Sequence, residues 1–167
     1  QTKAMPKEML PIVDKPVIQY VVEELVEAGI KDIIIVTGYH KRTIEDHFDM
    51  PNLDLIENLR MAGEKKKHLL DEVEKISEMA NFIYVRQKGP YGNGTPVLSA
   101  ASLVDDEPFV FAFGDDLVKS KVSFTKQMVD DYEKHGNLII GAQEVAPEDV
   151  VRYGIVKLKE GTNQLED

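Results

Sequence analysis

The chain of 167 residues contains no cysteine. This absence excludes disulfide bonds and thiol catalysis, and it is typical of proteins in a reducing cytoplasm. No apolar run approaches the roughly 20 residues that a membrane-spanning helix requires, and no signal-peptide pattern precedes the first helical segment. We therefore expect a soluble, cytoplasmic protein.

Positive charge is scarce as well, because the formal net charge is −10 at pH 7. Affinity for phosphate backbones and anionic lipid depends on clustered Lys and Arg, so we expect neither nucleic acid nor a membrane as a partner. A free nucleotide remains compatible with this charge. Its phosphates require only a few local cations, or a divalent metal that screens them from carboxylates.

The first half of the chain alternates between helical and strand patterns. Apolar residues recur at helical spacing from 17 to 28, and Gly29 is suited to end that helix. Residues 33–36 form a β-branched run of the kind that is buried in a parallel sheet, and residues 41–48 indicate a short helix. This alternation predicts an α/β fold.

The second half continues the alternation. Strands are predicted at residues 81–86, 108–113 and 137–144, and helices at 96–103 and 122–135. We expect one domain over residues 1–167, with a three-layer α/β/α, Rossmann-like architecture around a mostly parallel mixed sheet.

Residues 52–80 show no strand signal. Their leucine, isoleucine and valine residues are spaced for one or two helices, and charged residues dominate the rest. We interpret this region as a helical insertion that leaves the sheet, with a role in packing or subunit contact.

The segment from residue 2 to residue 20 is interrupted by three prolines, so it is neither one helix nor a central strand. We expect an ordered loop that presents cations close to the start of a helix, which is a common arrangement for binding phosphate. From composition alone, a basic surface loop with solvated lysines is the preferred interpretation of the segment. The ionic residues singled out in this segment are Lys3, Lys7, Lys15 and Glu8.

Two adjacent carboxylates, Asp115 and Asp116, follow the apolar run Pro108–Phe113 and Gly114. Ligands of open α/β sheets bind at the carboxyl ends of strands. Adjacent residues on a continuing strand point to opposite faces, so we expect one carboxylate to face the site unless the chain turns at Gly114. A single carboxylate, together with phosphate oxygens and water, is the usual way to hold Mg²⁺ in nucleotide sites. A turn-forming pair of aspartates is the alternative interpretation.

The loop between the predicted strand at 81–86 and the next helix contains Gly89, Gly92 and Gly94. Glycine permits a close approach of the backbone to a ligand and leaves N–H groups free. By itself this pattern is weak, because many such loops bind nothing.

The segment KAMPKEMLPIVDKPVIQYVVEE resembles the bacterial UTP–glucose-1-phosphate uridylyltransferases, members of the sugar-nucleotidyltransferase family. The GDD sequence at 114–116 and the VxxxxxxxYGIV segment at 145–156 resemble motifs of the same family. The resemblance implies a nucleotide-diphospho-sugar transferase fold, a homo-oligomer, and an enzyme that forms UDP-glucose and pyrophosphate from UTP and glucose 1-phosphate with Mg²⁺.

The resemblance also implies roles for individual residues. Catalytic roles fall to Lys7, at the phosphates, and Asp115, which holds Mg²⁺ with Asp116 as second choice. Uracil is expected beside Glu8, Gln87 and Gly92, and the sugar beside Gly154. No general base is needed, since a sugar phosphate is already ionised. The four histidines lack the spacing of a metal site, and we expect them to be structural or exposed.

Some features depart from the family pattern. The glycine-rich loop GxGTRxxP would precede Thr2, and the EKP-type motif would follow the last residues, so the chain resembles the middle portion of such an enzyme. The sequence GNGTPV replaces GxGH[AG]V at 92–97. Two alternatives remain open. One is another sugar-1-phosphate nucleotidyltransferase, for example of the thymidylyl type, although Glu8 favours the uridylyl type. The other is a catalytically incompetent fragment or binding module.

Overall fold

The computed structural model describes residues 3–90 and 92–166. It contains two compact units, Gln1–Gly136 and Asn137–Asp167, and each is described here by itself. That the whole chain forms one nucleotidyltransferase domain stays a prediction. In the described residues, no helix is both long and apolar enough to span a bilayer.

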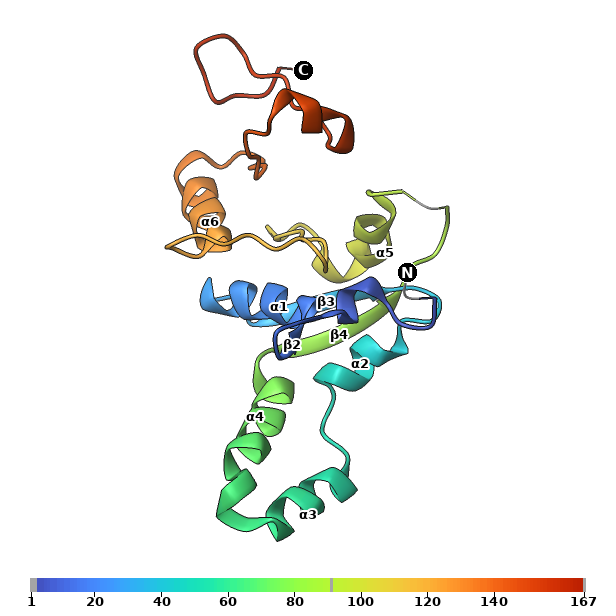
Figure 1. Ribbon diagram of the computed structural model, residues 1–167. Coiled ribbons are helices and arrows are strands. Elements are labelled where there is room, and N and C mark those ends of the chain that lie inside the picture. The colour runs from blue at the N-terminus through green and yellow to red at the C-terminus, as the bar shows by residue number, and fades with distance from the viewer. Residues whose placement is uncertain (1–2, 91, 167) are drawn as a thin grey trace. The chain divides into compact units, whose positions relative to one another are not determined.

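The first unit contains twelve elements in the described residues, and Figure 1 labels most of them. In chain order they are η1 Lys7–Met9, β1 Pro11–Ile12, β2 Lys15–Pro16, α1 Val17–Glu27, β3 Asp32–Thr37, α2 Arg42–Phe48, α3 Leu53–Met61, η2 Gly63–Lys66, α4 Lys67–Glu78, β4 Asn81–Arg86, α5 Thr95–Val104 and α6 Phe124–His135.

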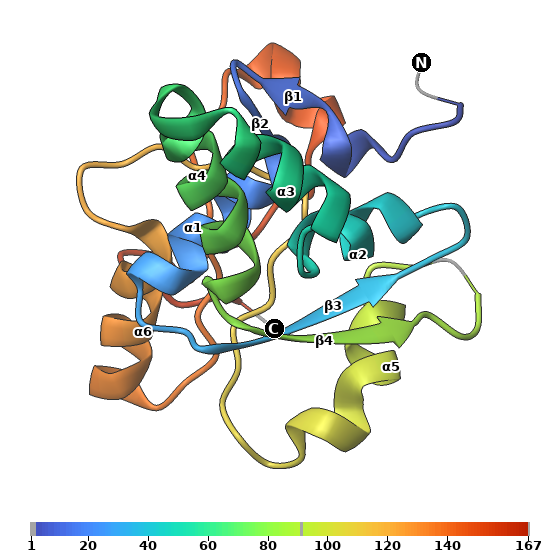
Figure 2. The ribbon, with the colours of Figure 1, turned by 90° about the horizontal axis from the view of Figure 1, so that it is seen from below.

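In the described residues, this unit contains two two-stranded sheets, the antiparallel hairpin β1–β2 and the parallel pair β3–β4, which pairs from Asp32 opposite Asn81 to Thr37 opposite Arg86. In two perpendicular views, α2, α3 and α4 lie on one side of β3 and β4, and α5 lies on the other (Figures 1 and 2). The order of helix, strand, helix layers agrees with the α/β architecture predicted from the alternating sequence.

The core lies on the side of the strands that faces α2 and α4. Its buried members come from α1, β3 and α2, and the aromatic ring of Phe82 on β4 packs against them. Each of these apolar side chains contributes on the order of 1.5–3 kcal/mol when it is fully buried. The buried residues of this cluster are Ile18, Val22, Ile33, Ile44 and Phe48.

Helix α1 begins after Pro16 and ends in a Schellman motif at Gly29. The amide of Gly29 donates to the carbonyl of Val26 at 2.9 Å, and the amide of Ile30 donates to that of Leu25 at 3.1 Å. Gly29 has a φ of 96°, a region that favours glycine. The predicted end of the helix is therefore confirmed, together with its physical cause.

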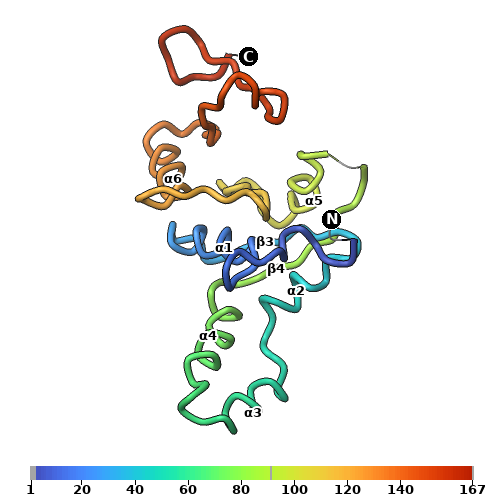
Figure 3. The backbone as a smooth tube through the Cα atoms, in the orientation of Figure 1, coloured from blue at the N-terminus to red at the C-terminus, as the bar shows by residue number. Residues whose placement is uncertain are grey.

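Helices α3 and α4 account for residues 52–80, as the apolar spacing predicts. They pack against each other, and the backbone between β3 and β4 extends away from the strands here (Figure 3). Asn52 caps α3 by accepting a hydrogen bond from the amide of Asp54 at 2.7 Å.

The strand predicted at residues 108–113 is wrong for this structure. The segment has no ladder partner in the described residues, and its phenylalanines are exposed, with Phe109 at 56%, Phe111 at 43% and Phe113 at 41%. A strand needs a neighbour to receive its hydrogen bonds, and β3 pairs only with β4 in the described residues. The apolar alternation shows β propensity but does not supply that neighbour.

The second unit contains a 3₁₀ helix, η3 Pro147–Arg152, and an isolated antiparallel bridge between Leu158 and Leu165. The strand predicted at residues 137–144 is also wrong, because the described residues offer it no hydrogen-bonded partner. The same physical reason applies, since local sequence does not determine pairing.

Val13 stands in the two-residue loop between β1 and β2 with a φ of 62°, and it is 95% exposed. A β-branched residue in this region is strained, and hairpin loops with positive φ at the first position favour glycine. We expect Val13→Gly to raise the free energy of unfolding by about 0.5–1 kcal/mol in urea denaturation. Val118→Gly is the matched control at an exposed valine without positive φ. An equal gain there would contradict the strain argument.

Candidate functional site

A cavity of about 410 Å³ lies where β3 ends. Its walls come from the loop before and within η1 and from the loop between β3 and α2, so it occupies the sheet edge at which open α/β proteins bind ligands. Three of its lining residues are lysines, which makes it a cationic site in an acidic protein. The lining residues are Lys3, Ala4, Met5, Pro6, Lys7, Glu8, Tyr39, His40 and Lys41.

Lys7 lines this cavity and forms an ion pair with Asp115, with 2.6 Å between Nζ and Oδ2. The hydrogen bond to Asp115 raises the pKa of Lys7 above its usual value, and the charges of Asp115, Glu8 and Asp116 add to this, while burial opposes it. The ammonium is therefore fully charged at neutral pH. Two residues that the sequence singled out separately, 108 positions apart, are in direct contact.

Glu8 is buried, with 6% of its surface exposed, and one oxygen accepts a hydrogen bond from Lys41 Nζ at 2.7 Å. The other oxygen, Oε2, is buried and has no partner among the described residues. Sequence reasoning missed Lys41. The only signal for it is a cation at the C-terminal end of a strand, next to the start of α2.

Gly114 brings the Asp115 turn against η1. A Cβ at this position would lie 3.3 Å from Glu8 Cγ and 3.4 Å from Ile18 Cδ1, so a larger residue would force the two segments apart. The chain turns here, because the amide of Asp116 donates to the carbonyl of Phe113 at 3.3 Å. This turn directs Asp115 to Lys7 and leaves Asp116 exposed to solvent.

Gln87 and Gly92 lie at the same edge of the sheet but do not line the cavity. The amide of Gln87 donates to the carbonyl of Thr37 at 2.8 Å, which places Gln87 directly after β4. Gly92 belongs to the loop that leads to α5, and its carbonyl accepts from the amide of Thr95. Gln87 directly follows β4, and both residues lie outside the set that lines the cavity with Lys7 and Glu8.

Gly154 lies in the second unit, just after η3. A Cβ added to this glycine would meet no atom within 4 Å. Its predicted contact with a sugar stays a prediction.

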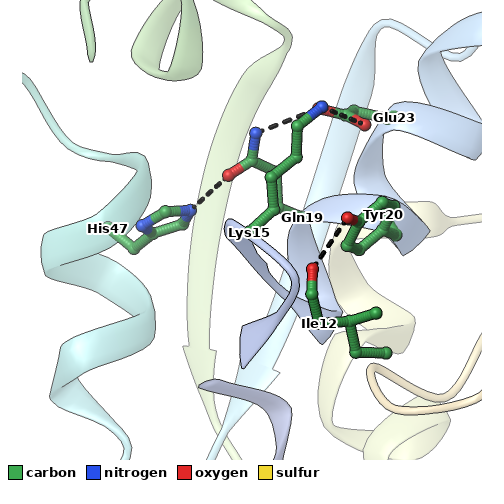
Figure 4. Close-up of polar contacts among 6 residues, drawn as sticks. All are labelled: Ile12, Lys15, Gln19, Tyr20, Glu23 and His47. Atoms are coloured by element: carbon green, nitrogen blue, oxygen red, sulfur yellow. Dashed lines mark hydrogen bonds and ion pairs between the residues drawn. The ribbon is translucent and has the colours of Figure 1, made fainter. Parts of the chain in front are cut away.

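A polar network connects β2, which follows the segment of Lys7 and Glu8, to helices α1 and α2 (Figure 4). Lys15 Nζ, at the start of β2, donates to Glu23 at 2.8 and 3.1 Å. Gln19 Nε2 donates to the same carboxylate at 2.9 Å, and Gln19 Oε1 lies 3.0 Å from Nε2 of His47 on α2. Since Gln19 Oε1 is an acceptor, the proton of the imidazole is on Nε2.

A second tie fixes the β1–β2 hairpin to α1, because the hydroxyl of Tyr20 donates to the carbonyl of Ile12 at 2.9 Å (Figure 4). The backbone that follows η1 is thus held from two sides. Such support limits the positional freedom of Lys7 and Glu8, as a preorganised site requires.

Burial lowers the pKa of His47 below its ordinary value of 6.5. As the pH falls, His47 therefore takes up a proton in the unfolded chain at a higher pH than in the folded chain. The stability that the neutral imidazole contributes is complete above pH 6.5 and is lost as the pH falls through the lowered value. We expect His47→Gln to flatten the loss of unfolding free energy between pH 7.5 and 5.0, measured in urea. The exposed His68→Gln serves as control, and an equal flattening there would contradict this assignment.

A second cavity of about 340 Å³ lies between the end of α2, the end of α4 and β4. Its walls include Phe48, Phe82 and Tyr84. None of the residues predicted to bind substrate lines it, so the cavity at the end of β3 is the better candidate.

The donor set at Asp115 fits a nucleotide-bound Mg²⁺ and does not fit an all-protein metal cage. No group of three or more His, Asp or Glu side chains in the described residues is arranged to hold an ion. Mg²⁺ typically takes one or two carboxylates and completes its shell with substrate phosphates and water. Asp115 and the adjacent Asp116 would supply the protein ligands.

A parallel α/β unit with a lysine-lined cavity at the end of β3, where Lys7 also contacts Asp115, has the arrangement of α/β proteins that bind ligands at strand ends. Comparison with known proteins identifies the family within this class. The family model described as nucleotidyl transferase matches residues 2–166, and the chain therefore belongs to the nucleotidyl transferase family.

Individual relatives are similar over nearly the whole chain. A UTP–glucose-1-phosphate uridylyltransferase of Bacillus subtilis (strain 168) is 54% identical over 155 residues, which cover 93% of this chain and 52% of the relative. A UTP-bound UGPase from Acinetobacter baumannii has a TM-score of 0.86 at 39% identity and covers 97% of this chain. A UDP-glucose pyrophosphorylase complexed with UDP-glucose has a TM-score of 0.80 at 41% identity, again over 97% of this chain.

These similarities confirm the predicted fold class and family. The chain spans about half the length of the relatives it matches, namely 52% of the Bacillus protein and 57% and 58% of the two solved structures.

Proposed function

We propose that this chain forms the nucleotide-binding part of an enzyme that makes UDP-glucose and pyrophosphate from UTP and glucose 1-phosphate. The observation that carries the proposal is the Lys7–Asp115 pair beside a lysine-lined cavity at the end of β3. The names of the similar proteins support the choice of uridylyl transfer to glucose 1-phosphate.

The reaction is a displacement at phosphorus. An oxygen of the sugar phosphate attacks the α-phosphorus of UTP, a new P–O bond forms, and the bond to pyrophosphate breaks as pyrophosphate leaves with its electrons. No proton transfer is required, because the attacking phosphate is ionised at neutral pH. The protein therefore contributes by positioning substrates and neutralising charge.

Individual residues have distinct roles in this proposal. Lys7 neutralises phosphate charge, and Asp115 holds Mg²⁺ with Asp116 in support. When bound, the Mg²⁺ screens the α-phosphate from nearby carboxylates. Glu8, Gln87 and Gly92 face uracil, and Gly154 faces glucose.

A chimera tests the proposal at the level of catalysis. In it, residues of this chain replace the matching 155-residue segment of the Bacillus subtilis relative. We expect the chimera to release pyrophosphate from UTP only when glucose 1-phosphate and Mg²⁺ are present. A correctly folded chimera without this activity would contradict the proposal.

The thymidylyl alternative is tested in the same assay by replacing UTP with dTTP. Faster turnover with dTTP would favour that alternative over uridylyl transfer. Titration calorimetry on the chain itself distinguishes a binding module from an inert fragment, since only the former releases heat with Mg–UTP.

We also propose that the protein works in the cytoplasm, which the absence of cysteine supports. The homo-oligomeric state implied by the resemblance stays a prediction.

A further inference from the structure

The proposed function gives Lys7 and Asp115 two different ligands, yet in this structure each is the ligand of the other. Lys7 Nζ and Asp115 Oδ2 are 2.6 Å apart. A phosphate would need the ammonium that Asp115 now occupies, and a cation would need the carboxylate that Lys7 now occupies.

Contacts other than this ion pair hold η1 and the turn at 114–116 together. Gly114 packs directly on the side chain of Glu8, and Glu8 is held independently by Lys41 at 2.7 Å. The Lys7 side chain is 63% exposed and that of Asp115 is 28% exposed. The pair can therefore separate by side-chain rotation, while η1 and the turn at 114–116 stay in contact.

We propose that the Lys7–Asp115 pair is an internal counter-ion pair that couples the binding of a divalent cation to the binding of a nucleoside triphosphate. This inference rests on the proposed function, because it assumes that Lys7 meets phosphate and Asp115 meets metal. A metal–nucleotide complex exchanges partners with the pair: its cation goes to Asp115 and its anion goes to Lys7.

Either ligand alone meets opposition. A free cation must displace an ammonium group from Asp115 and then remains close to that positive charge. A free triphosphate must draw Lys7 away from a carboxylate and then faces Asp115, Asp116 and the buried Glu8 without screening. The complex replaces one ion pair by two, so the two ligands favour each other's binding.

This coupling predicts gains as well as losses of affinity, which a purely attractive role for either residue does not. We expect Lys7→Met to bind Mn²⁺ alone about five-fold more tightly, because the competing ammonium is gone. We expect Asp115→Asn to bind UTP in the presence of EDTA more tightly by a similar factor. Both variants should bind Mn–UTP about ten-fold or more weakly than the parent chain.

The measurement is titration calorimetry of the 167-residue chain with Mn²⁺, with UTP in EDTA, and with Mn–UTP. Lys3→Met is the matched control. It removes the same charge from the same cavity, at a lysine that forms no ion pair in the part of the chain described here. Circular dichroism verifies that each variant is folded, and the two single variants test the inference independently.

The outcomes separate the inference from the proposed function. If the parent binds Mn–UTP but neither variant gains affinity for its single ligand, the coupling is wrong and the proposed function stands. An equal gain in Mn²⁺ affinity for Lys3→Met would also overturn the coupling, since it would reflect general electrostatics. If the parent does not bind Mn–UTP, both the proposed function of this chain and the coupling are overturned.

Discussion

Asp115→Asn is expected to lower the rate of UDP-glucose formation by the chimera by about 10²–10³-fold, the usual cost of removing one group that stabilises transition-state charge. The substitution keeps the size of the side chain but removes its negative charge. It also weakens an ion pair in which Lys7 is 63% exposed, so the loss of stability should stay below about 1 kcal/mol. A loss of activity without unfolding therefore reports on chemistry at this position.

Two controls accompany this prediction. Asp106→Asn changes an exposed carboxylate close to the end of α5 and should leave the rate within about two-fold, as is usual for surface substitutions. Asp116→Asn should have an intermediate effect, because Asp116 is the second choice as a metal ligand. If Asp116→Asn were more damaging than Asp115→Asn, the assignment of the two carboxylates would be reversed.

Lys41→Met is expected to lower the free energy of unfolding by about 2 kcal/mol. Removing one partner of a fully buried ion pair costs about 3–5 kcal/mol, and the partial exposure of Lys41, at 36% of its side chain, reduces that figure. The cost arises because Glu8 Oε1 loses its donor at a site where Oε2 already lacks one among the described residues.

A double-mutant cycle separates this cost from the general loss of a lysine. The double variant Lys41→Met with Glu8→Gln should recover most of the stability, since no buried charge is left unpaired. Lys31→Met, at an exposed lysine close to the start of β3, is the matched control and should change the unfolding free energy by less than about 0.5 kcal/mol. An additive cycle in urea denaturation would show that the two side chains do not interact.

Local sequence patterns predicted most helices and both strands of the parallel sheet. The apolar spacing of α1 and the positive φ of Gly29 are set by neighbouring residues. The β-branched run of β3 likewise needs only its own sequence to indicate a buried strand. Those predictions succeeded because the determining interactions lie within a few residues.

Predictions that depended on distant partners fared differently. Phe109–Phe113 has the composition of a strand, but it remains unpaired and exposed, because pairing requires a neighbour that composition does not specify. Lys41 escaped notice because its partner Glu8 is 33 positions away, and nothing in a local pattern indicates such a pair.

The residues of the candidate site were partly foreseen. The resemblance to a known family pointed to both Lys7 and Asp115, whereas the strand expected before Asp115 does not form in the described residues. The resemblance did not indicate that the two would be in contact. That contact depends on the close packing of Gly114 on Glu8, which is a property of the folded chain.

The measurement that tests the central claim most directly is a titration of the ¹⁵N-labelled chain with Mg–UTP, followed by backbone amide chemical shifts. If the cavity at the end of β3 is the nucleotide site, the largest shifts should occur at Lys7, Glu8 and His40. Shifts confined to Phe82 and Tyr84 at the other cavity, or no shifts at all, would contradict the account.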